Sequence, residues 1–283
     1  MSSYLARIYT NITQHPRPLR FLISRILMMT PWSRHLSVRR EDYVLNFFPT
    51  SLSAAMWANP NFRADEERFL RDILRTGDVV IDVGANIGST ALACAVAVGP
   101  KGSVLAVEPH PRIYGYLKAN IARNAAHQIE TLQCAISDEA GEAVFTDRRS
   151  DDQNAISSRG CIMVPRLRLD DISPRGKISL LKVDVEGHEY FVFKGGEDTL
   201  KRVDIVYFEF VPNLVQTGSV ALPWQPLLDG GFKIYEKTAD SIKLAKLPPD
   251  QETMLIALKN TELLTKREGL SPRSVLRMSG IEK

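Results

Sequence analysis

From Gly77 onward, short apolar runs alternate with segments of helical pattern, and this alternation constrains the fold of the 283-residue chain more than any other feature. The runs are rich in β-branched residues and are apolar at consecutive positions, which is typical of strands buried on both faces. They occupy 78–83, 103–108, 129–137, 178–184, 203–209, 231–236 and 253–259. Apolar residues recur at the spacing of a helix face in five segments. One precedes the first run, at 65–75, and the others lie between the runs, at 89–98, 111–124, 188–201 and 224–228. The pattern predicts an α/β fold with a mostly parallel sheet and helices on both faces.

Polar residues gather where the predicted strands end. Right-handed crossovers bring the carboxyl ends of parallel strands to one edge of the sheet, where ligands bind. Five polar residues stand at or near such ends: Asp82, Glu108, Ser137, Asp184 and Glu209. Residues 138–177 interrupt the alternation beside this edge, and we interpret them as a lid over the substrate or as an edge hairpin.

The positive charge of the chain is concentrated at its N-terminal end. Residues 1–42 hold seven arginines and two acidic residues, or +5, whereas the whole chain carries +3, so the remainder is close to neutral. A nucleic-acid partner is therefore not expected, because the core offers no basic track. We expect residues 1–60 to form a basic arm with helices that lead into a ligand-binding domain at 61–259, followed by a tail at 260–283.

The arm contains one apolar run, residues 19–29, which Arg20 and Arg25 interrupt. At 11 residues it is too short to span a bilayer. It is interpreted either as a helix that packs on the main domain or as one that lies on anionic lipid, with residues 17–34 in peripheral contact with the membrane. No small-residue cleavage site follows the run, so a secretory signal is not expected.

The three cysteines, Cys94, Cys134 and Cys161, lie far apart in the sequence and form no CxxC pair. Neither a disulfide framework nor a zinc site is expected, and buried free thiols are predicted instead. This cysteine usage favours a reducing compartment, so we expect a cytoplasmic protein that can lie at the inner face of the membrane.

A glycine-rich turn follows the first predicted strand and reads D-V-G-A-N-I-G over 82–88. Gly84, Asn86 and Gly88 tolerate left-handed backbone angles and let the chain approach a ligand closely. The turn departs from the dinucleotide fingerprint G-x-G-x-x-G, because Asn86 and Ser89 take the places of its second and third glycines. A tight turn that binds no ligand is the alternative interpretation.

The second predicted strand ends in Glu108-Pro109. An acidic side chain at this place can accept hydrogen bonds from both hydroxyls of a ribose. The glycine turn and this acid together predict an adenosine-containing ligand, without choosing between NAD and S-adenosylmethionine. A capping role for Glu108 at the next helix is the alternative.

A third segment, 180–196, places Asp184, Glu186 and Glu189 around Gly187, and the following strand brings Glu209 beside them. Acids at a helix N-terminus also have a stabilising role through the helix dipole. His188 is a candidate proton acceptor or a capping residue. A divalent cation held by these carboxylates is left open, although no ligand spacing requires a metal.

Five segments, in this order, resemble the FkbM family of S-adenosylmethionine-dependent methyltransferases: DVGANIG (82–88), VEPHP (107–111), AISDEAGE (135–142), LRLDDI (167–172) and LKVDVEGHE (181–189). The resemblance covers about residues 43–258. It implies a class I methyltransferase (Rossmann-like) fold with seven strands, the last of them antiparallel. It also implies S-adenosyl-L-methionine as cofactor and O-methylation of a sugar hydroxyl in a glycolipid, polysaccharide or secondary metabolite.

The resemblance further implies roles for individual residues. The amino-acid part of the cofactor is expected to lie against Asp82, Gly84, Ala85, Asn86 and Gly88. Glu108 is expected to hold the ribose, and the adenine is expected to lie between Pro109 and His110 on one side and Ala135, Ile136 and Ser137 on the other. Asp184 is expected to reach the methionine end of the cofactor or the acceptor.

Four residues are our catalytic candidates: Asp184, Glu186, Glu209 and His188. A proton acceptor would speed methyl transfer to a hydroxyl, and Glu186 and Glu209 are the first candidates for that base, with His188 next. Crowding of like charges is expected to raise the pKa of one carboxyl group among them. The acceptor, a small molecule or a glycan, is expected to contact 43–62, 146–160 and 210–226. Candidate contacts there and on the strands are the aromatic Trp57, Trp224 and Tyr207, which are core residues in the alternative interpretation, and the polar Asn154, Ser157 and Ser158.

Three other functions are weighed against this one. An NAD-dependent oxidoreductase fits the imperfect glycine fingerprint poorly. A nucleic-acid amino-methyltransferase would carry an Asn/Asp-Pro-Pro-aromatic tetrapeptide after the fourth strand, and the chain has none there. A non-catalytic, membrane-associated scaffold that has kept the methyltransferase fold is motivated by the basic arm.

Overall fold

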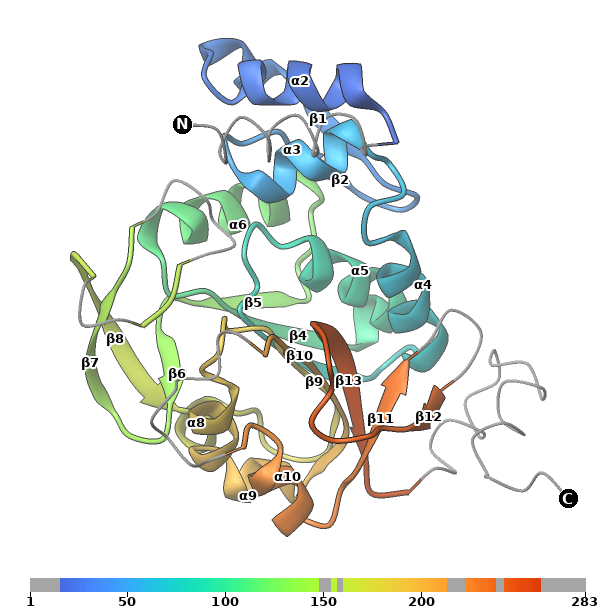
Figure 1. Ribbon diagram of the computed structural model, residues 1–283, viewed down its shortest axis with the longest axis vertical. Helices are drawn as coiled ribbons and strands as arrows, with labels where there is room; N and C mark the ends of the chain where they lie inside the picture. Colours follow the sequence, from blue (N-terminus) through green and yellow to red (C-terminus); the bar gives the residue numbers. More distant parts are fainter. Residues whose placement is uncertain (1–15, 148–153, 157–159, 213–221, 238–241, 261–283) are drawn as a thin grey trace, which may run out of the picture.

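The computed structural model describes residues 16–147, 154–156, 160–212, 222–237 and 242–260. An eight-stranded sheet with the order β12-β11-β13-β10-β9-β3-β4-β5 runs through the centre (Figure 1). Its strands are β3 (Val79–Val83), β4 (Ser103–Val107), β5 (Ile129–Leu132), β9 (Ile178–Val183), β10 (Val203–Phe210), β11 (Lys233–Lys237), β12 (Ile242–Leu244) and β13 (Thr253–Leu258). Neighbours from β10 to β5 are parallel, and β13 runs antiparallel to both β10 and β11. This is the class I methyltransferase arrangement, with the predicted antiparallel last strand.

Helices cover both faces of the sheet, as predicted. On one face lie α4 (Ala64–Ile73), α5 (Ser89–Val98) and α6 (Pro111–Arg123), and on the other lie α8 (Glu189–Lys194), α9 (Glu197–Leu200) and α10 (Gln225–Asp229). Short helices η2 (Gly99–Lys101) and α7 (Leu169–Ile172) complete the connections. Alternate strand residues enter two separate core clusters, for example Val80 on the α5 face and Ile81 on the α8 face. Each strand is thus apolar at consecutive positions because both of its faces are buried.

Two predicted elements are divided in the structure. The run 129–137 forms β5 in the main sheet and β6 (Ala135–Ser137) in a second, three-stranded sheet with β8 (Ile162–Arg168) and β7 (Gly141–Phe145). Its second half is apolar because Ala135 packs in a small core of its own with Phe145. The predicted helix 188–201 is interrupted between α8 and α9, where a Cβ on Gly195 would overlap the carbonyl oxygen of Ser137.

The main sheet also has one strand more than the predicted seven. β12 pairs antiparallel with β11 and extends the sheet at that edge. The antiparallel pair β7–β8 confirms the hairpin interpretation of 138–177. Part of the segment interpreted as a lid, residues 148–153 and 157–159, lies outside the described residues.

The arm is built from α2 (Pro18–Leu27), η1 (Pro31–His35), the hairpin β1 (Ser37–Arg39) and β2 (Val44–Asn46), and α3 (Ser51–Ala58). Val38, Leu45 and Met56 belong to the same core cluster as the helices α4 to α6. From β1 onward, therefore, the arm packs as part of the main domain. Within the described ranges, no helix has both the length and the apolar character needed to cross a membrane.

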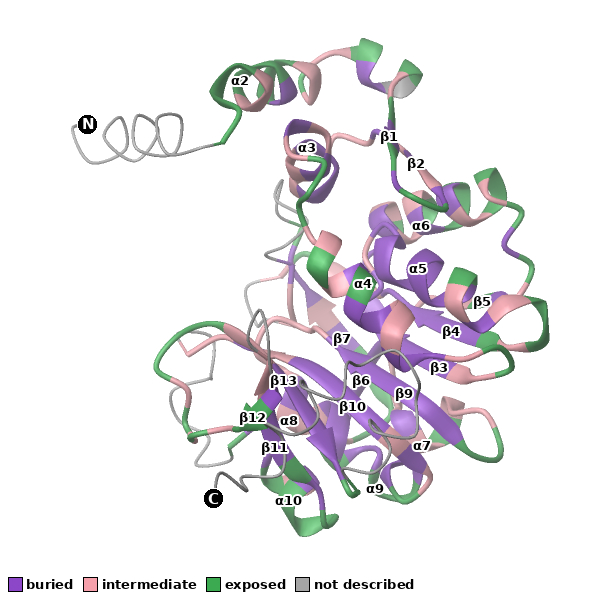
Figure 2. Cartoon of the chain, turned by 90° about the vertical axis from the view of Figure 1, so that its right-hand side faces the viewer, coloured by how far each residue is buried: buried purple, intermediate pink, exposed green. Residues whose placement is uncertain are grey.

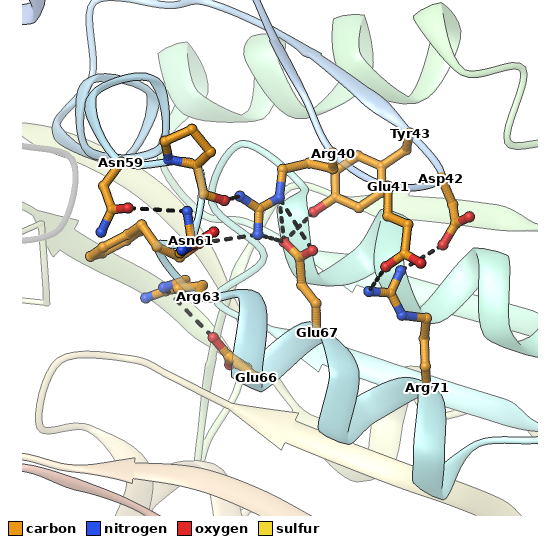
Figure 3. A network of polar contacts seen from close by, with 12 residues as sticks. Arg40, Glu41, Asp42, Tyr43, Asn59, Asn61, Arg63, Glu66, Glu67 and Arg71 are labelled. Carbon is orange, nitrogen blue, oxygen red and sulfur yellow. Dashed lines mark hydrogen bonds and ion pairs between the residues drawn. The ribbon is translucent and has the colours of Figure 1, made fainter. Parts of the chain in front are cut away.

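A buried polar network ties the arm to α4 (Figure 3). Arg40 donates through Nε to both carboxylate oxygens of Glu67, at 3.0 and 3.2 Å, and Tyr43 donates to the same group at 2.6 Å. The other guanidinium nitrogens of Arg40 donate to the carbonyl oxygens of Pro60 and Phe62, at 2.6 and 3.1 Å. The network thereby fixes the loop that leads into α4.

The cysteines follow the prediction in two cases of three. Cys94 and Cys134 are buried and free. Cys161 is exposed instead, because it precedes β8 on the outer three-stranded sheet and not a strand of the main sheet. Among the described residues, no disulfide joins these thiols.

Candidate active site

A pocket opens at the carboxyl ends of β3, β4 and β9, the edge predicted for a ligand. Together with its open mouth it encloses about 740 Å³ of empty space. The predicted cofactor residues that line it are Gly84, Asn86, Glu108, Pro109, Ala135 and Ile136. Three of the four catalytic candidates, Asp184, Glu186 and His188, line the same pocket, and Arg63, Phe145, Asn154 and Ile156 complete much of its wall.

The turn after β3 has the conformation that its glycines suggested. Gly84 and Gly88 have φ values of 81° and 92°, and Asn86 has a φ of 50°. A Cβ on Gly84 would overlap the carbonyl oxygen of Asp184, so a glycine is required there by the contact between two strand ends. A Cβ on Gly88 would likewise overlap the side chain of Leu117. The turn is thus pressed onto β9 and α6, and Asn86 is left facing the pocket.

Glu108 is buried at the pocket wall and organises the turn. Its two carboxylate oxygens accept hydrogen bonds from the backbone N–H groups of Asn86, at 3.0 Å, and His110, at 2.9 Å. Glu108 also lines the pocket, so its carboxylate lies within reach of a ligand bound there. The side-chain cap of α6 is His110, whose Nδ1 accepts from the N–H of Arg112 at 3.2 Å.

A buried lysine that sequence reasoning missed lies beneath the turn. The Nζ of Lys182 on β9 donates to the carbonyl oxygen of Gly84 and to Oδ2 of Asp184, both at 3.2 Å, and lies 3.3 Å from Oδ1 of Asp82. Burial lowers the pKa of Lys182, but the charges of Asp184 and Asp82 outweigh that effect and raise it. Asp82 is fully buried and does not line the pocket, so it acts on the site through this ammonium group.

Arg63 is a second cation that the sequence did not single out. Its guanidinium lies 3.7 Å from Asp184 and 3.7 Å from Glu66, and it lines the pocket. Burial opposes its charge, yet the neighbouring carboxylates, Glu66 foremost, raise the pKa of Arg63. Its φ of 58° turns the chain into α4 directly after the carbonyl groups that Arg40 holds, and Figure 3 shows the Arg63–Glu66 pair beside that network.

Three of the predicted catalytic carboxyl groups lie together. Oxygen atoms of Asp184, Glu186 and Glu209 are all within 4.8 Å of one another. Burial opposes ionisation of Asp184, but Lys182 and Arg63 lower its pKa to about 2. Burial and the charge of Asp184 raise the pKa of Glu209 to about 9. Burial is the larger cause, the charge of Asp184 acts in the direction expected from crowding, and Glu209 with this pKa is protonated at neutral pH. Because two cations already pair with Asp184, the cluster does not require a metal ion for its charge balance.

The remaining candidates differ in their suitability as a base. Burial lowers the pKa of His188 to about 4, so its ring is neutral at pH 7 and a weak proton acceptor. Its Nε2 lies 3.0 Å from Oγ of Ser137, and its ring stacks on Phe191. Glu186 has a φ of 54° in the sharp bend that it forms with Gly187, and it lines the pocket.

The structure shows the positions of only some of the residues that were expected to contact the acceptor. Trp224 and Tyr207 are core residues, which agrees with the alternative interpretation of these aromatic side chains. Trp57 is half-buried on α3, with Arg20 over its ring. The segment 146–160 contributes Asn154 and Ile156 to the pocket, whereas Ser157 and Ser158 lie outside the described residues, as does most of 210–226.

The raised pKa of Glu209 predicts a specific dependence of stability on pH. The folded-state value, about 9, lies above the unfolded value, near 4.5, so the folded state holds the proton more tightly. Its stabilising effect is therefore complete below about pH 4.5 and is lost as the pH rises to about 9. Between pH 6 and 9, the free energy of unfolding of ligand-free protein is expected to fall more steeply than in Glu209→Gln, by up to about 1.4 kcal/mol per pH unit.

Urea unfolding at several pH values measures this difference. Glutamine keeps a donor toward Asp184 but does not titrate, so the variant isolates the ionisation of Glu209. Glu130→Gln, at an exposed position of β5, is the matched control and is expected to keep the wild-type slope. Equal slopes for the wild type and Glu209→Gln would show that Glu209 is not protonated in the folded state.

Comparison with known proteins agrees with the geometry of the pocket. Residues 82–222 match the family model described as "Methyltransferase FkbM domain". The chain is 31% identical to the methyltransferase sdnD of Sordaria araneosa, over 65% of this chain and 82% of that protein. It is 29% identical to the hexuronic acid methyltransferase AglP of Haloferax volcanii, over 54% of this chain and 65% of that protein.

A third relative is the 2-O-methyltransferase NoeI of Sinorhizobium fredii, which is 29% identical over 53% of this chain and 70% of that protein. The chain thus spans just under two thirds of the length of AglP and more of the other two. The family match contains the glycine turn, Glu108 and the carboxyl cluster around Asp184. With the sheet order, the pocket and this match in agreement, the chain belongs to the FkbM family of S-adenosylmethionine-dependent methyltransferases.

Proposed function

We propose that this protein transfers a methyl group from S-adenosyl-L-methionine to a hydroxyl group of a sugar in a small molecule or glycan. The observation that carries the proposal is a pocket lined both by Glu108 and by Asp184 and Glu186 of the carboxyl cluster. Two relatives support the acceptor class by their names, one for hexuronic acid and the other for 2-O-methylation. The match to the family of methyltransferases argues against the oxidoreductase alternative.

The residues of the pocket fit the cofactor. The Glu108 carboxylate at the end of a strand suits a ribose diol, and Pro109, Ile136 and Phe145 offer apolar surface for the adenine. Gly84 and Asn86 border the space for the amino-acid part. The remaining predicted cofactor residues do not line the pocket, and we assign them the role of shaping it: Asp82, Ala85, Gly88, His110 and Ser137.

When bound, the cofactor supplies an electrophilic methyl group on a positively charged sulfur. Asp184 stays ionised at neutral pH because Lys182 and Arg63 hold it, so it provides a fixed negative charge beside the pocket. Holding the acceptor oxygen in line with the methyl group, and excluding water, can supply about 7–11 kcal/mol of the barrier. The chain's own task is therefore orientation and charge placement.

Glu186 is the residue that we assign as general base. It lines the pocket, whereas Glu209 carries its proton at pH 7 and His188 is a weak acceptor. Removing the proton of the acceptor hydroxyl from a position within hydrogen-bond reach contributes about 10²–10⁴-fold to the rate. Glu209, through its hydrogen bond, keeps Asp184 oriented toward the pocket.

A labelled-methyl assay tests this proposal. Wild-type protein, incubated with labelled S-adenosylmethionine and with uronic acid glycosides, glycolipid and glycan extracts, is expected to place the label on a sugar oxygen. Glu186→Gln is expected to lower kcat by about 10²–10⁴-fold while the affinity for S-adenosylmethionine is kept. Glu130→Gln serves as the control. Label on a protein, nucleic acid or non-sugar lipid group would overturn the acceptor class, and a fully active Glu186→Gln would overturn the assigned base.

Binding of the cofactor without transfer to any acceptor would favour the remaining alternative, a scaffold that has kept the fold. The cytoplasmic location and the domain limits 1–60, 61–259 and 260–283 stay predictions. Truncated chains test the boundary at residue 60 most simply. A chain that begins at residue 61 lacks Val38 and Leu45, which belong to the core cluster.

A further inference from the structure

Helix α2 uses only one side to pack on the rest of the molecule. Ser24 is buried, Leu27 and Met28 pack against the core, and the guanidinium carbon of Arg20 lies 4.7 Å from the centre of the Trp57 ring on α3. In both views α2 is the outermost helix of the arm, with α3 between it and the sheet (Figure 1 and Figure 2). The opposite side of α2 has no packing role within the described residues.

That opposite side is apolar. Leu19, Leu22, Ile23 and Ile26 recur at the spacing of one helix face, and their exposed fractions range from 39 to 74%. At 100° per residue the four side chains span an arc of about 100°. Met29 and Trp32, exposed to 72 and 74%, continue the surface past the helix. We call these six residues the arm face.

The arm face is a cluster and not a scatter of single residues. It contains six of the twelve large hydrophobic side chains that are exposed in the described part of the chain, within a stretch of 14 residues. Singly exposed apolar residues are normal on protein surfaces, whereas a contiguous group indicates a contact surface. A tryptophan at its rim is typical of the boundary between lipid and water.

Charge selects the kind of partner. Residues 1–40 contain seven arginines and no acidic residue. Arg17 and Arg25 are exposed at the two ends of α2. A second copy of this chain would bring arginines against arginines, which is unfavourable, whereas anionic phospholipid headgroups would complement them.

We propose that the arm face docks on an anionic phospholipid membrane, with its apolar side chains in the interfacial region and Arg17 and Arg25 at the headgroups. The helix then lies in the plane of the surface, because α2 has 10 residues and its exposed apolar side chains share one face. The proposal does not depend on the identity of the methyl acceptor. It assigns residues 16–34 a role in location and not in catalysis.

Co-sedimentation of the full chain with vesicles tests the proposal. The protein is expected to bind vesicles that contain phosphatidylglycerol, to bind pure phosphatidylcholine much more weakly, and to dissociate as salt is raised. Ile26→Glu is expected to weaken binding about tenfold or more, because it places a negative charge in the apolar contact. Arg25→Glu is expected to weaken binding to the anionic vesicles alone.

The matched control is Leu244→Glu, since Leu244 on β12 is exposed to 68% and Ile26 to 62%. Both side chains are exposed, so thermal unfolding is expected to show that both variants fold. Failure of the wild type to bind anionic vesicles, or equal binding by Ile26→Glu and Leu244→Glu, would overturn the proposal. So would a wild-type oligomer in solution that Ile26→Glu dissociates, because a second copy would then cover the arm face.

Discussion

Replacing Lys182 with methionine is expected to destabilise the fold by about 3–5 kcal/mol at neutral pH. The lysine is 1% exposed, and its ammonium group lies within 3.3 Å of carboxylate oxygens on both Asp82 and Asp184. Methionine fills a similar volume, so the loss comes from the carboxylate of Asp82, which stays buried without its ion-pair partner, and from that of Asp184, which keeps only Arg63. The difference from wild type is expected to shrink as the pH falls and these carboxylates become protonated.

Urea unfolding of Lys182→Met, followed at two pH values, measures this loss. Lys201→Met is the matched control, because Lys201 also pairs with an aspartate, Asp198, but is 73% exposed. An exposed pair of this kind contributes little, so the control is expected to unfold as wild type does. Adding Asp82→Asn to Lys182→Met is expected to recover part of the loss by removing one orphaned charge. A Lys182→Met variant as stable as wild type would show that the buried ion pairs do not hold the turn in place.

The strand pattern was sufficient to predict the sheet and most of its elements. Consecutive apolar residues such as Val80 and Ile81 face two different cores, and that double burial is visible in a sequence as an unbroken apolar run. The helices α5 and α6 were predicted within one residue of their observed ends, because Gly99 and Asn124 follow them. The split of 129–137 was missed, because apolar residues look alike whether they bury in one core or in two.

The residues of the site were predicted where each lies at the end of a strand. Glu108, Asp184 and Glu186 reach the pocket because the topology brings their strand ends to one edge. Lys182 and Arg63 were missed, since the interactions that give them a role are long-range: Lys182 contacts β3 and Arg63 enters from the loop before α4. One sequence signal was present, a lysine inside the otherwise apolar strand LLKVD, where a buried charge demands partners.

Substitution of Glu108 by glutamine is expected to lower the affinity for S-adenosylmethionine about 100-fold. The carboxylate lines the pocket at the end of β4, where an acidic side chain can accept hydrogen bonds from the two hydroxyls of a ribose. Hydrogen bonds to a charged group are worth about 1.5–3 kcal/mol, and glutamine replaces one acceptor oxygen with a donor. A loss of this size corresponds to a factor of about 100 in the dissociation constant.

Calorimetric titration with S-adenosylmethionine, and separately with NAD, tests the central claim most directly. The expected result is stoichiometric binding of S-adenosylmethionine to wild type and to the exposed control Glu130→Gln, about 100-fold weaker binding to a folded Glu108→Gln, and no binding of NAD. Unchanged affinity in Glu108→Gln, or selective binding of NAD, would contradict the assignment of this pocket.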